Sequence, residues 1–234
     1  MKITLIHGQS HKGTSYHAGR MLVDQLTDKE NVKEFFLPRD MPHFCNGCYA
    51  CLKDEKKCPH YPALSPITES IYEADLLVFT TPVYCMRTTG AMKALLDHLF
   101  IWWASHRPQE EMFSKKAVII SVGAGTGMTK TADDIKVSLN FWGISDIIVC
   151  KQRSLSSTWV DADDKIKEEV RQKITRIAEK IKQNKHAKVS LKVKFIFTMM
   201  RMMQKKGMSG SKEDRMYWEK KGWLANQRPW KRRI

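Results

Sequence analysis

Short apolar runs alternate along the chain with longer segments in which apolar residues recur every three or four positions. Five short runs have the length and composition of buried strands, at residues 3–6, 32–37, 75–80, 117–122 and 144–149. Five longer segments have helical spacing, at residues 15–26, 66–73, 90–103, 131–141 and 163 to about 185. Ser65 and Pro66 predict the N-cap and the first turn of the second helix. This alternation predicts right-handed strand–helix–strand units, and therefore an α/β fold with a five-stranded parallel sheet covered on both faces.

The loops after the strands contain the residues of most chemical interest, because parallel sheets bind ligands at the carboxyl ends of their strands. The first of these loops reads Gly8-Gln9-Ser10-His11-Lys12-Gly13-Thr14-Ser15. It places hydroxyl groups and backbone N–H groups at the start of a helix, which suits a phosphate. The loop is neither a dinucleotide-binding GxGxxG sequence nor a Walker A sequence. An ordinary strand-to-helix turn capped by Thr14 or Ser15 is the alternative interpretation.

Charge divides the chain into two unequal parts. The 234 residues carry a net charge of +15, and 42% of them are hydrophobic, which is enough for a folded core. Residues 1–150 contain 16 basic and 16 acidic side chains, whereas residues 151–234 contain 24 basic and 9 acidic ones. We therefore do not expect a uniformly basic nucleic-acid-binding protein. We expect a domain over residues 1–185 and a basic, Met- and Trp-rich C-terminal arm over residues 186–234.

The arm has an ambiguous pattern. Residues 186–195 alternate with a period of two, but a helical stripe also fits, and we favour the helix. The stripe consists of Leu191, Phe195, Met199, Met202 and Met203. Three partners are compatible with basic residues interleaved with aromatic ones: a second subunit, an anionic membrane surface and a nucleic acid. We favour them in that order, so we expect a homodimer or homotetramer and no nucleic acid partner.

The chain contains no stretch of the length needed to span a membrane. Its longest uncharged segments, residues 76–86 and 117–129, fall short of the roughly 20 apolar residues of a span. Met1 and Lys2 lead directly into the first strand pattern, without the apolar region of a signal peptide. We therefore expect a cytoplasmic protein whose cysteines are reduced.

Four of the six cysteines lie close together in sequence, at Cys45, Cys48, Cys51 and Cys58. Four thiolates at this spacing can hold one [4Fe–4S] cluster. The alternatives are an empty or redox-active thiol loop and, third in order, a zinc ion held by the four cysteines. Scattered histidines are more often hydrogen-bonded groups than ligands, so we assign no site to His7, His43, His60, His98 and His106.

Two motifs resemble those of the NADPH-dependent FMN reductases over residues 1–185. Residues 80–85 (TTPVYC) and 90–97 (GAMKALLD) resemble the family's TPVY…G.LK..ID pattern, and residues 8–15 resemble its GSxRKGxS loop, with Gln9 in place of the first serine. The resemblance implies a flavodoxin-like three-layer sandwich that binds FMN and uses NAD(P)H as co-substrate. It also implies the cofactor-binding residues: Ser10, His11, Lys12, Thr14 and Ser15 at the phosphate, Pro82, Val83, Tyr84, Cys85 and Met86 against the isoalloxazine, and Gly123, Gly125 and Gly127 in the loop after the fourth strand.

The resemblance implies an FMN-dependent oxidoreductase that takes hydride from NAD(P)H and reduces a quinone, a flavin or another small acceptor. Such a reaction needs no acid–base side chain, because hydride passes directly between nicotinamide and flavin. The cysteine motif resembles that of iron–sulfur flavoproteins, which implies single-electron transfer through a [4Fe–4S] cluster as an alternative. A non-catalytic flavin-binding module, attached to a membrane surface or a partner by its basic tail, is a third interpretation.

Overall fold

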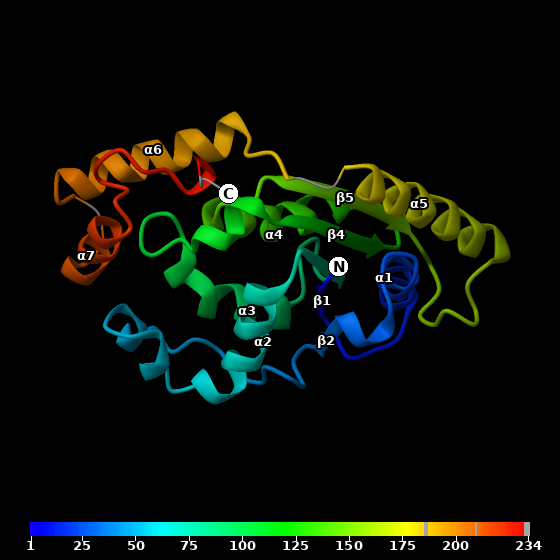
Figure 1. Cartoon of the computed structure of the whole chain (residues 1–234). Helices are drawn as coiled ribbons and strands as arrows, with labels where there is room; N and C mark the ends of the chain where they lie inside the picture. The colour runs from blue at the N-terminus through cyan, green and yellow to red at the C-terminus, as the bar shows by residue number, and fades with distance from the viewer. Residues whose placement is uncertain (185–186, 209, 232–234) are drawn as a thin grey trace.

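The computed structural model describes residues 1–184, 187–208 and 210–231. Its centre is a five-stranded parallel sheet with the strand order β2-β1-β3-β4-β5 (Figure 1). The strands are β1 (Ile3–His7), β2 (Val32–Phe36), β3 (Leu76–Pro82), β4 (Lys116–Gly123) and β5 (Asp146–Arg153). The predicted α/β fold is confirmed. The boundary that we expect between residues 185 and 186 lies outside the described residues.

Helices cover both faces of the sheet, which makes three layers (Figure 1). On one face lie α1 (Thr14–Asp24) and α5 (Asp164–Gln183), and on the other lie α2 (Tyr61–Glu73), α3 (Gly90–His98) and α4 (Met128–Trp142). Neighbouring residues of a strand face opposite layers, so in β3 Val78 packs with the first pair of helices and Phe79 with the second group. Because both faces are covered, the central strands are apolar throughout.

The start of α2 differs from the prediction. The helix begins at Tyr61, and Ser65 lies inside it rather than at its N-cap. Pro62 occupies the first turn, where the missing N–H group has no partner to lose, and Pro66 is accommodated one turn later. Two prolines four residues apart are both compatible with an early helix position, so the local sequence does not decide between them.

The described part of the C-terminal arm is helical, so the helix that we favoured over a strand is confirmed. It contains α6 (Leu191–Lys205) and α7 (Lys212–Lys220). Its aromatic side chains Phe197, Trp218 and Trp223 form a cluster with Phe113 and Ala104 of the same chain. These arm residues therefore pack on their own domain. Within the described part of the chain, no helix is both long and apolar enough to cross a membrane.

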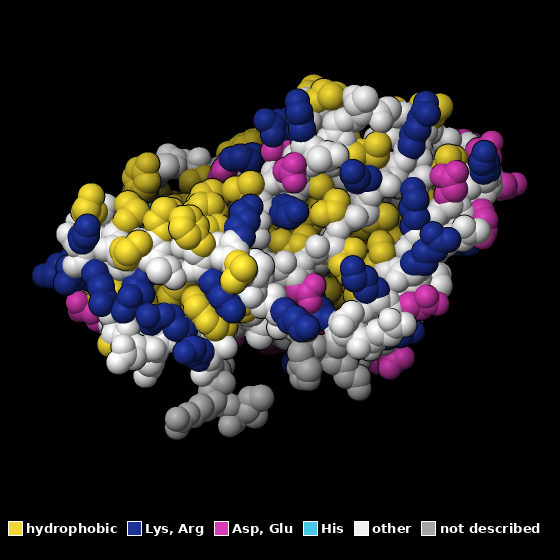
Figure 2. All heavy atoms as spheres, turned by 90° about the horizontal axis from the view of Figure 1, so that it is seen from above, with side chains coloured by type: hydrophobic (Ala, Val, Ile, Leu, Met, Phe, Trp, Pro, Cys, Tyr) yellow, Lys and Arg dark blue, Asp and Glu magenta, His cyan; other side chains and the backbone are white. Residues whose placement is uncertain are grey.

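The outward side of α6 exposes apolar side chains. Leu191, Phe195 and Met202 are 83%, 67% and 51% exposed. Hydrophobic side chains gather over this end of the molecule and are bordered by many Lys and Arg side chains (Figure 2). The surface of the arm is thus both apolar and basic.

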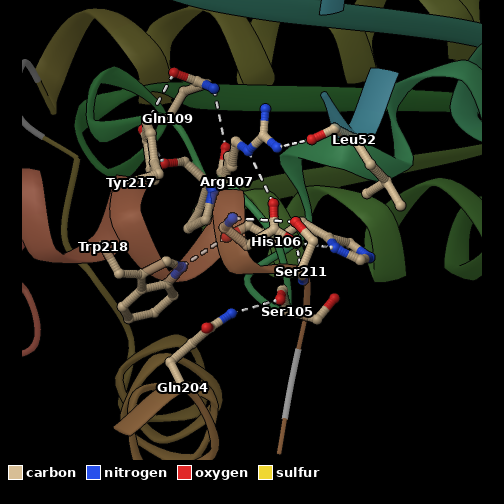
Figure 3. A network of polar contacts seen from close by, with 11 residues as sticks. Leu52, Ser105, His106, Arg107, Gln109, Gln204, Ser211, Tyr217 and Trp218 are labelled. Atoms are coloured by element: carbon tan, nitrogen blue, oxygen red, sulfur yellow. Dashed lines mark hydrogen bonds and ion pairs between the residues drawn. The ribbon is translucent and has the colours of Figure 1, made fainter. Parts of the chain in front are cut away.

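A buried carboxylate fixes the arm to the domain. The Asp214 side chain is fully buried, and it accepts hydrogen bonds from His106 Nδ1 at 2.9 Å and Arg107 Nε at 2.8 Å. It also accepts the backbone N–H of Ser211 at 2.9 Å, which caps α7. The indole of Trp218 donates to the His106 carbonyl at 2.6 Å (Figure 3). Residues 105–109 and α7 therefore form one polar network inside an aromatic cluster.

The charge of Asp214 is stabilised by its partners. Burial alone raises the pKa of this carboxyl group, but the hydrogen bonds from His106 and the Ser211 N–H and the positive charge of Arg107 outweigh burial and lower the pKa overall. A carboxylate with a lowered folded pKa contributes stability above its unfolded pKa of about 3.9. That contribution is lost as the pH falls through the folded value.

We predict that Asp214→Asn lowers the free energy of unfolding by about 3 kcal/mol near neutral pH, because it leaves the Arg107 guanidinium buried without its counter-charge. Urea denaturation measures this. Asp133→Asn, which removes an exposed carboxylate from α4, is the control and should change stability by less than about 0.5 kcal/mol. The difference in free energy of unfolding between Asp214→Asn and the original protein should become smaller below about pH 4, because Asp214 is then protonated. A difference that stays constant into that acid range contradicts this account.

Candidate functional site

The carboxyl ends of the strands form one edge of the sheet, and their loops meet around a cavity of about 330 Å³. Four segments line it: the loop after β1, the turn after β3, the end of β4 and a serine-rich loop after β5. The lining residues are Gln9, His11, Gly13, Thr14, Ser15, Pro82, Val83, Tyr84, Val122, Gly123, Ala124, Ser154, Ser156 and Ser157. Seven of the thirteen predicted cofactor-binding residues are therefore among the lining residues.

The first loop ends at the N-terminus of α1, which opens into the cavity. Gly13 is the N-cap, and no side chain of the described residues caps it. The N–H groups of the first helical turn are thus available to an anion, and the helix dipole favours negative charge there. Ser15 is buried in the cavity wall, and the Thr14 hydroxyl lies 3.0 Å from the hydroxyl of Ser154. The start of α1 therefore presents N–H and hydroxyl groups to the cavity.

Two predicted phosphate ligands point elsewhere. The hydroxyl of Ser10 donates to the carbonyl oxygen of Leu37 at 3.3 Å, and the Lys12 ammonium lies 5.3 Å from the centre of the Tyr16 ring. Neither residue lines the cavity. His11 does line it, and its Nε2 donates to the Ser157 carbonyl oxygen at 2.5 Å. The hydrogen bond of His11 closes the first loop against the loop after β5.

The turn after β3 has an unusual backbone. Tyr84 and Arg87 exchange two backbone hydrogen bonds, and between them Cys85 and Met86 have φ values of 48° and 66°. Left-handed conformations at non-glycine residues cost of order 1–3 kcal/mol each and persist where surrounding contacts impose them. Here Asp134 of α4 imposes the turn, because it accepts Arg87 Nη1 at 2.7 Å and the next backbone N–H at 3.1 Å. Such strain is typical of functional sites.

Tyr84 also bridges two loops. Its hydroxyl donates to Gln9 Oε1 at 2.6 Å across the mouth of the cavity. Gln9 stands where the family's loop pattern has its first serine, and it was not among the predicted site residues. The serines at 154, 156 and 157 were also missed. They follow β5, whose observed end at Arg153 lies four residues beyond the predicted end of the strand.

The glycine loop after β4 packs closely on the turn after β3. A Cβ atom on Gly123 would lie 2.8 Å from Val83 Cγ2, and one on Gly127 would lie 2.8 Å from Val83 Cγ1. A Cβ atom on Gly125, in contrast, would meet no other described residue within 4 Å apart from its two chain neighbours. Two of the three glycines therefore serve the contact between the loops, and only Gly125 leaves open space next to the backbone.

The four clustered cysteines form a second site, beside the end of α3. Cys45, Cys48, Cys51 and Cys58 all line one small cavity of about 20 Å³, and all are free thiols. Burial, followed by the proximity of the other three thiols, raises the pKa of Cys51 to about 11. The bare Cys51 thiol thus stays protonated near neutral pH, and a thiolate at this position requires a cation. This donor set fits an iron–sulfur cluster or a zinc ion.

Two histidines border the cysteine site. His60 Nδ1 lies 3.0 Å from His98 Nε2, and His98 Nδ1 lies 2.8 Å from the carbonyl oxygen of Ala94. The His60 ring stacks on His43 with a centroid distance of 4.4 Å. Partial burial and the adjacent rings of His43 and His98 lower the pKa of His60, which favours its neutral form. The side chains of Cys58, His60 and His98 offer ligand atoms that all lie within 4.8 Å of one another.

Comparison with known proteins identifies the family. The model of the NADPH-dependent FMN reductases matches residues 1–157. The chain therefore belongs to this family of FMN-dependent oxidoreductases. Among curated relatives, an NAD(P)H-dependent FMN reductase of Pseudomonas aeruginosa is 28% identical over 120 residues, which cover 48% of this chain and 62% of the relative.

Other curated relatives are named iron–sulfur flavoproteins. An iron–sulfur flavoprotein of Methanocaldococcus jannaschii is 30% identical over 98 residues, which cover 42% of this chain and 50% of that protein. The chain spans between 48% and 62% of the lengths of the curated relatives that it matches. The FMN complex of an FMN-dependent NADH-azoreductase from Bacillus anthracis superposes with a TM-score of 0.58 at 13% identity, covering 77% of this chain and 99% of that one. This similarity confirms the flavodoxin-like fold.

The cavity at the sheet edge fits FMN in its chemistry. The open N-terminus of α1 and the Ser15 hydroxyl suit the phosphate, and the apolar surface of Pro82 and Val83 suits a flat ring. Gly125 leaves space for close approach of the backbone.

We predict that Gly123→Ala destabilises the protein by about 1–3 kcal/mol, because its methyl group would overlap Val83 in a packed contact. Gly125→Ala is the matched control, since its methyl group meets open space, and its melting temperature should be unchanged. Thermal unfolding of the two variants measures the difference. The double variant Gly123→Ala, Val83→Ala should recover part of the loss. Equal destabilisation by both glycine substitutions contradicts the packing explanation.

Proposed function

We propose that this protein is an FMN-dependent oxidoreductase that takes reducing equivalents from NAD(P)H and passes them to a quinone, a flavin or another small acceptor. The observation that carries the proposal is the convergence, on one cavity, of the open α1 N-terminus, the strained turn after β3 and the loop after β4. Membership of the NADPH-dependent FMN reductase family supports the choice of cofactor and reductant.

Each part of the cavity has a separate task in this proposal. The N–H groups that follow Gly13, together with Ser15, bind the phosphate and set the depth of the cofactor. The turn held by Asp134 orients the backbone at the polar edge of the ring, and a bound flavin supplies the two-electron chemistry. The two hydrogen bonds to Asp134 keep these groups in a fixed position despite the backbone strain at Cys85 and Met86.

Access to the ring is from the side of the β3 turn. Tyr84 and Met86 are 51% and 46% exposed, so this side of the cavity is open to solvent. The reductant and the acceptor use this same open side in alternation. The Tyr84 hydroxyl, which donates to Gln9, fixes the position of the exposed ring that both molecules would meet.

We predict that Ser15→Ala weakens FMN binding about 10-fold or more and leaves riboflavin binding unchanged, because only FMN has the phosphate that the hydroxyl would bind. Ser10→Ala is the matched control, since that hydroxyl is directed at the Leu37 carbonyl, and it should change FMN affinity less than about twofold. Quenching of flavin fluorescence on titration with apoprotein measures both affinities. If Ser15→Ala loses affinity for FMN and riboflavin equally, the Ser15 hydroxyl does not bind the phosphate.

The enzymatic part of the proposal is tested by turnover. FMN-loaded protein should oxidise NADH or NADPH continuously when a quinone is present. If the loaded protein oxidises neither nucleotide with several acceptors, the chain is a flavin-binding module and the enzyme proposal is wrong.

A second candidate function is that of an iron–sulfur flavoprotein that transfers single electrons. The four cysteines that line one cavity favour it, as does the similarity to proteins of that name. A cluster would convert the two-electron chemistry of a flavin into single-electron transfer. Four iron and four sulfide per chain after purification without air would support this candidate, and protein without sulfide contradicts it.

We also infer that the arm mediates association. Its exposed Leu191, Phe195 and Met202 support a contact between two copies of the chain, because exposed apolar residues of this kind mark interaction sites. The neighbouring lysines favour an anionic membrane surface as the alternative partner. Sedimentation velocity distinguishes the two: a monomer that binds anionic vesicles would contradict the dimer or tetramer.

A further inference from the structure

Cys58, His60 and His98 form a second group of metal-ligating side chains, which shares only Cys58 with the four-cysteine set. The two imidazole nitrogens that face each other, His60 Nδ1 and His98 Nε2, are 3.0 Å apart. In a tetrahedral zinc site with bonds of about 2.0–2.1 Å, two nitrogen ligands lie about 3.3 Å apart. The observed separation is close to that value, and one ligand atom from each of Cys58, His60 and His98 lies within 4.8 Å of the other two.

The proton positions in this group are fixed by one hydrogen bond. The carbonyl oxygen of Ala94 can only accept, so His98 Nδ1 carries a proton and donates it at 2.8 Å. With its Nδ1 proton committed to this bond, His98 offers Nε2 as its ligand nitrogen, and Nε2 points toward His60. A histidine that donates one ring N–H to a backbone carbonyl and presents the other nitrogen is the usual arrangement of a metal ligand.

The surrounding structure holds the three side chains in place. His98 is buried at the end of α3, with 5% of its surface exposed. His60 directly precedes α2, and its ring stacks on His43 with an angle of 10° between the planes. Cys58 lies two residues earlier, and its carbonyl accepts the N–H of Tyr61 at 2.9 Å. An ion bound by these residues would tie the cysteine loop to α3.

We propose that Cys58, His60 and His98 bind a divalent transition-metal ion, for which Zn²⁺ is the best match to one thiolate and two imidazole ligands. On binding, the Cys58 thiol releases its proton to solvent, and the proton between the two imidazoles moves from His60 Nδ1 to Nε2. One proton leaves the protein per ion. Cys58 belongs to both donor sets, so this ion and a [4Fe–4S] cluster exclude each other. The fourth position takes water or a further ligand.

Co²⁺ titration of the full-length protein, with a non-thiol reductant present, tests the site. We expect one ion per chain, the ligand-field bands of tetrahedral Co²⁺ and a thiolate-to-cobalt charge-transfer band, and displacement of Co²⁺ by Zn²⁺. His60→Ala should weaken binding by about 100-fold or more. Its side chain is partly exposed, so the variant is expected to fold, and far-UV circular dichroism verifies this. His98→Gln should have the same effect on binding.

Two matched variants separate this site from a four-cysteine site. His43→Ala removes the ring that stacks on His60 but no proposed ligand, and Cys45→Ser removes a cysteine that is outside the set. Both should bind Co²⁺ within about threefold of the original protein. Retention of the ion by His60→Ala, its loss in Cys45→Ser, or no binding at micromolar Co²⁺ overturns the proposal. Because metal is measured directly, the result does not depend on whether the protein binds FMN.

Discussion

The hydroxyl group of Thr89 joins the two loops on which the functional edge of this protein depends. It accepts the backbone N–H of Met92 at 3.1 Å, which caps α3, and donates to the Gly8 carbonyl at 2.6 Å in the loop after β1. The approach is possible because Gly8 has no side chain: a Cβ atom there would lie 3.0 Å from Thr81 Oγ1. The start of α1, the Tyr84–Gln9 hydrogen bond and the cavity between them all require the two loops at this separation.

Local patterns in the sequence predict the elements well, because a core residue must recur with the period of its helix or strand. They predict less about where elements begin and end, as α2 and β5 show: Pro62 and Pro66 are equally compatible with a first turn, and the apolar run of β5 ends before its hydrogen bonding does. The site depends on pairs that are far apart in sequence, such as Tyr84 with Gln9 and His98 with His60. Such pairs leave no local pattern, so the turn strain and the histidine pair become visible only in the folded chain.

The structure shows that the basic C-terminal arm packs on the domain and keeps its lysines in solvent. The excess of basic residues lies beyond residue 150, and α5 and α6 carry about half of it, whereas α7 has three basic and three acidic side chains. The arm is nevertheless part of the folded core, because its Trp218 and Trp223 are buried with Phe113 and its Asp214 is buried between His106 and Arg107. One buried carboxylate and an aromatic cluster attach it, while the lysines remain in solvent.

In the proposed function, the loop before α1 binds the phosphate of FMN. A crystal structure of the protein with FMN tests it most directly. We expect the phosphate at the N-terminus of α1, within hydrogen-bond distance of the N–H groups after Gly13 and of the Ser15 hydroxyl. The ring should lie against Pro82 and Val83. A phosphate bound away from α1, or a crystal grown with excess FMN that contains no flavin, would contradict it.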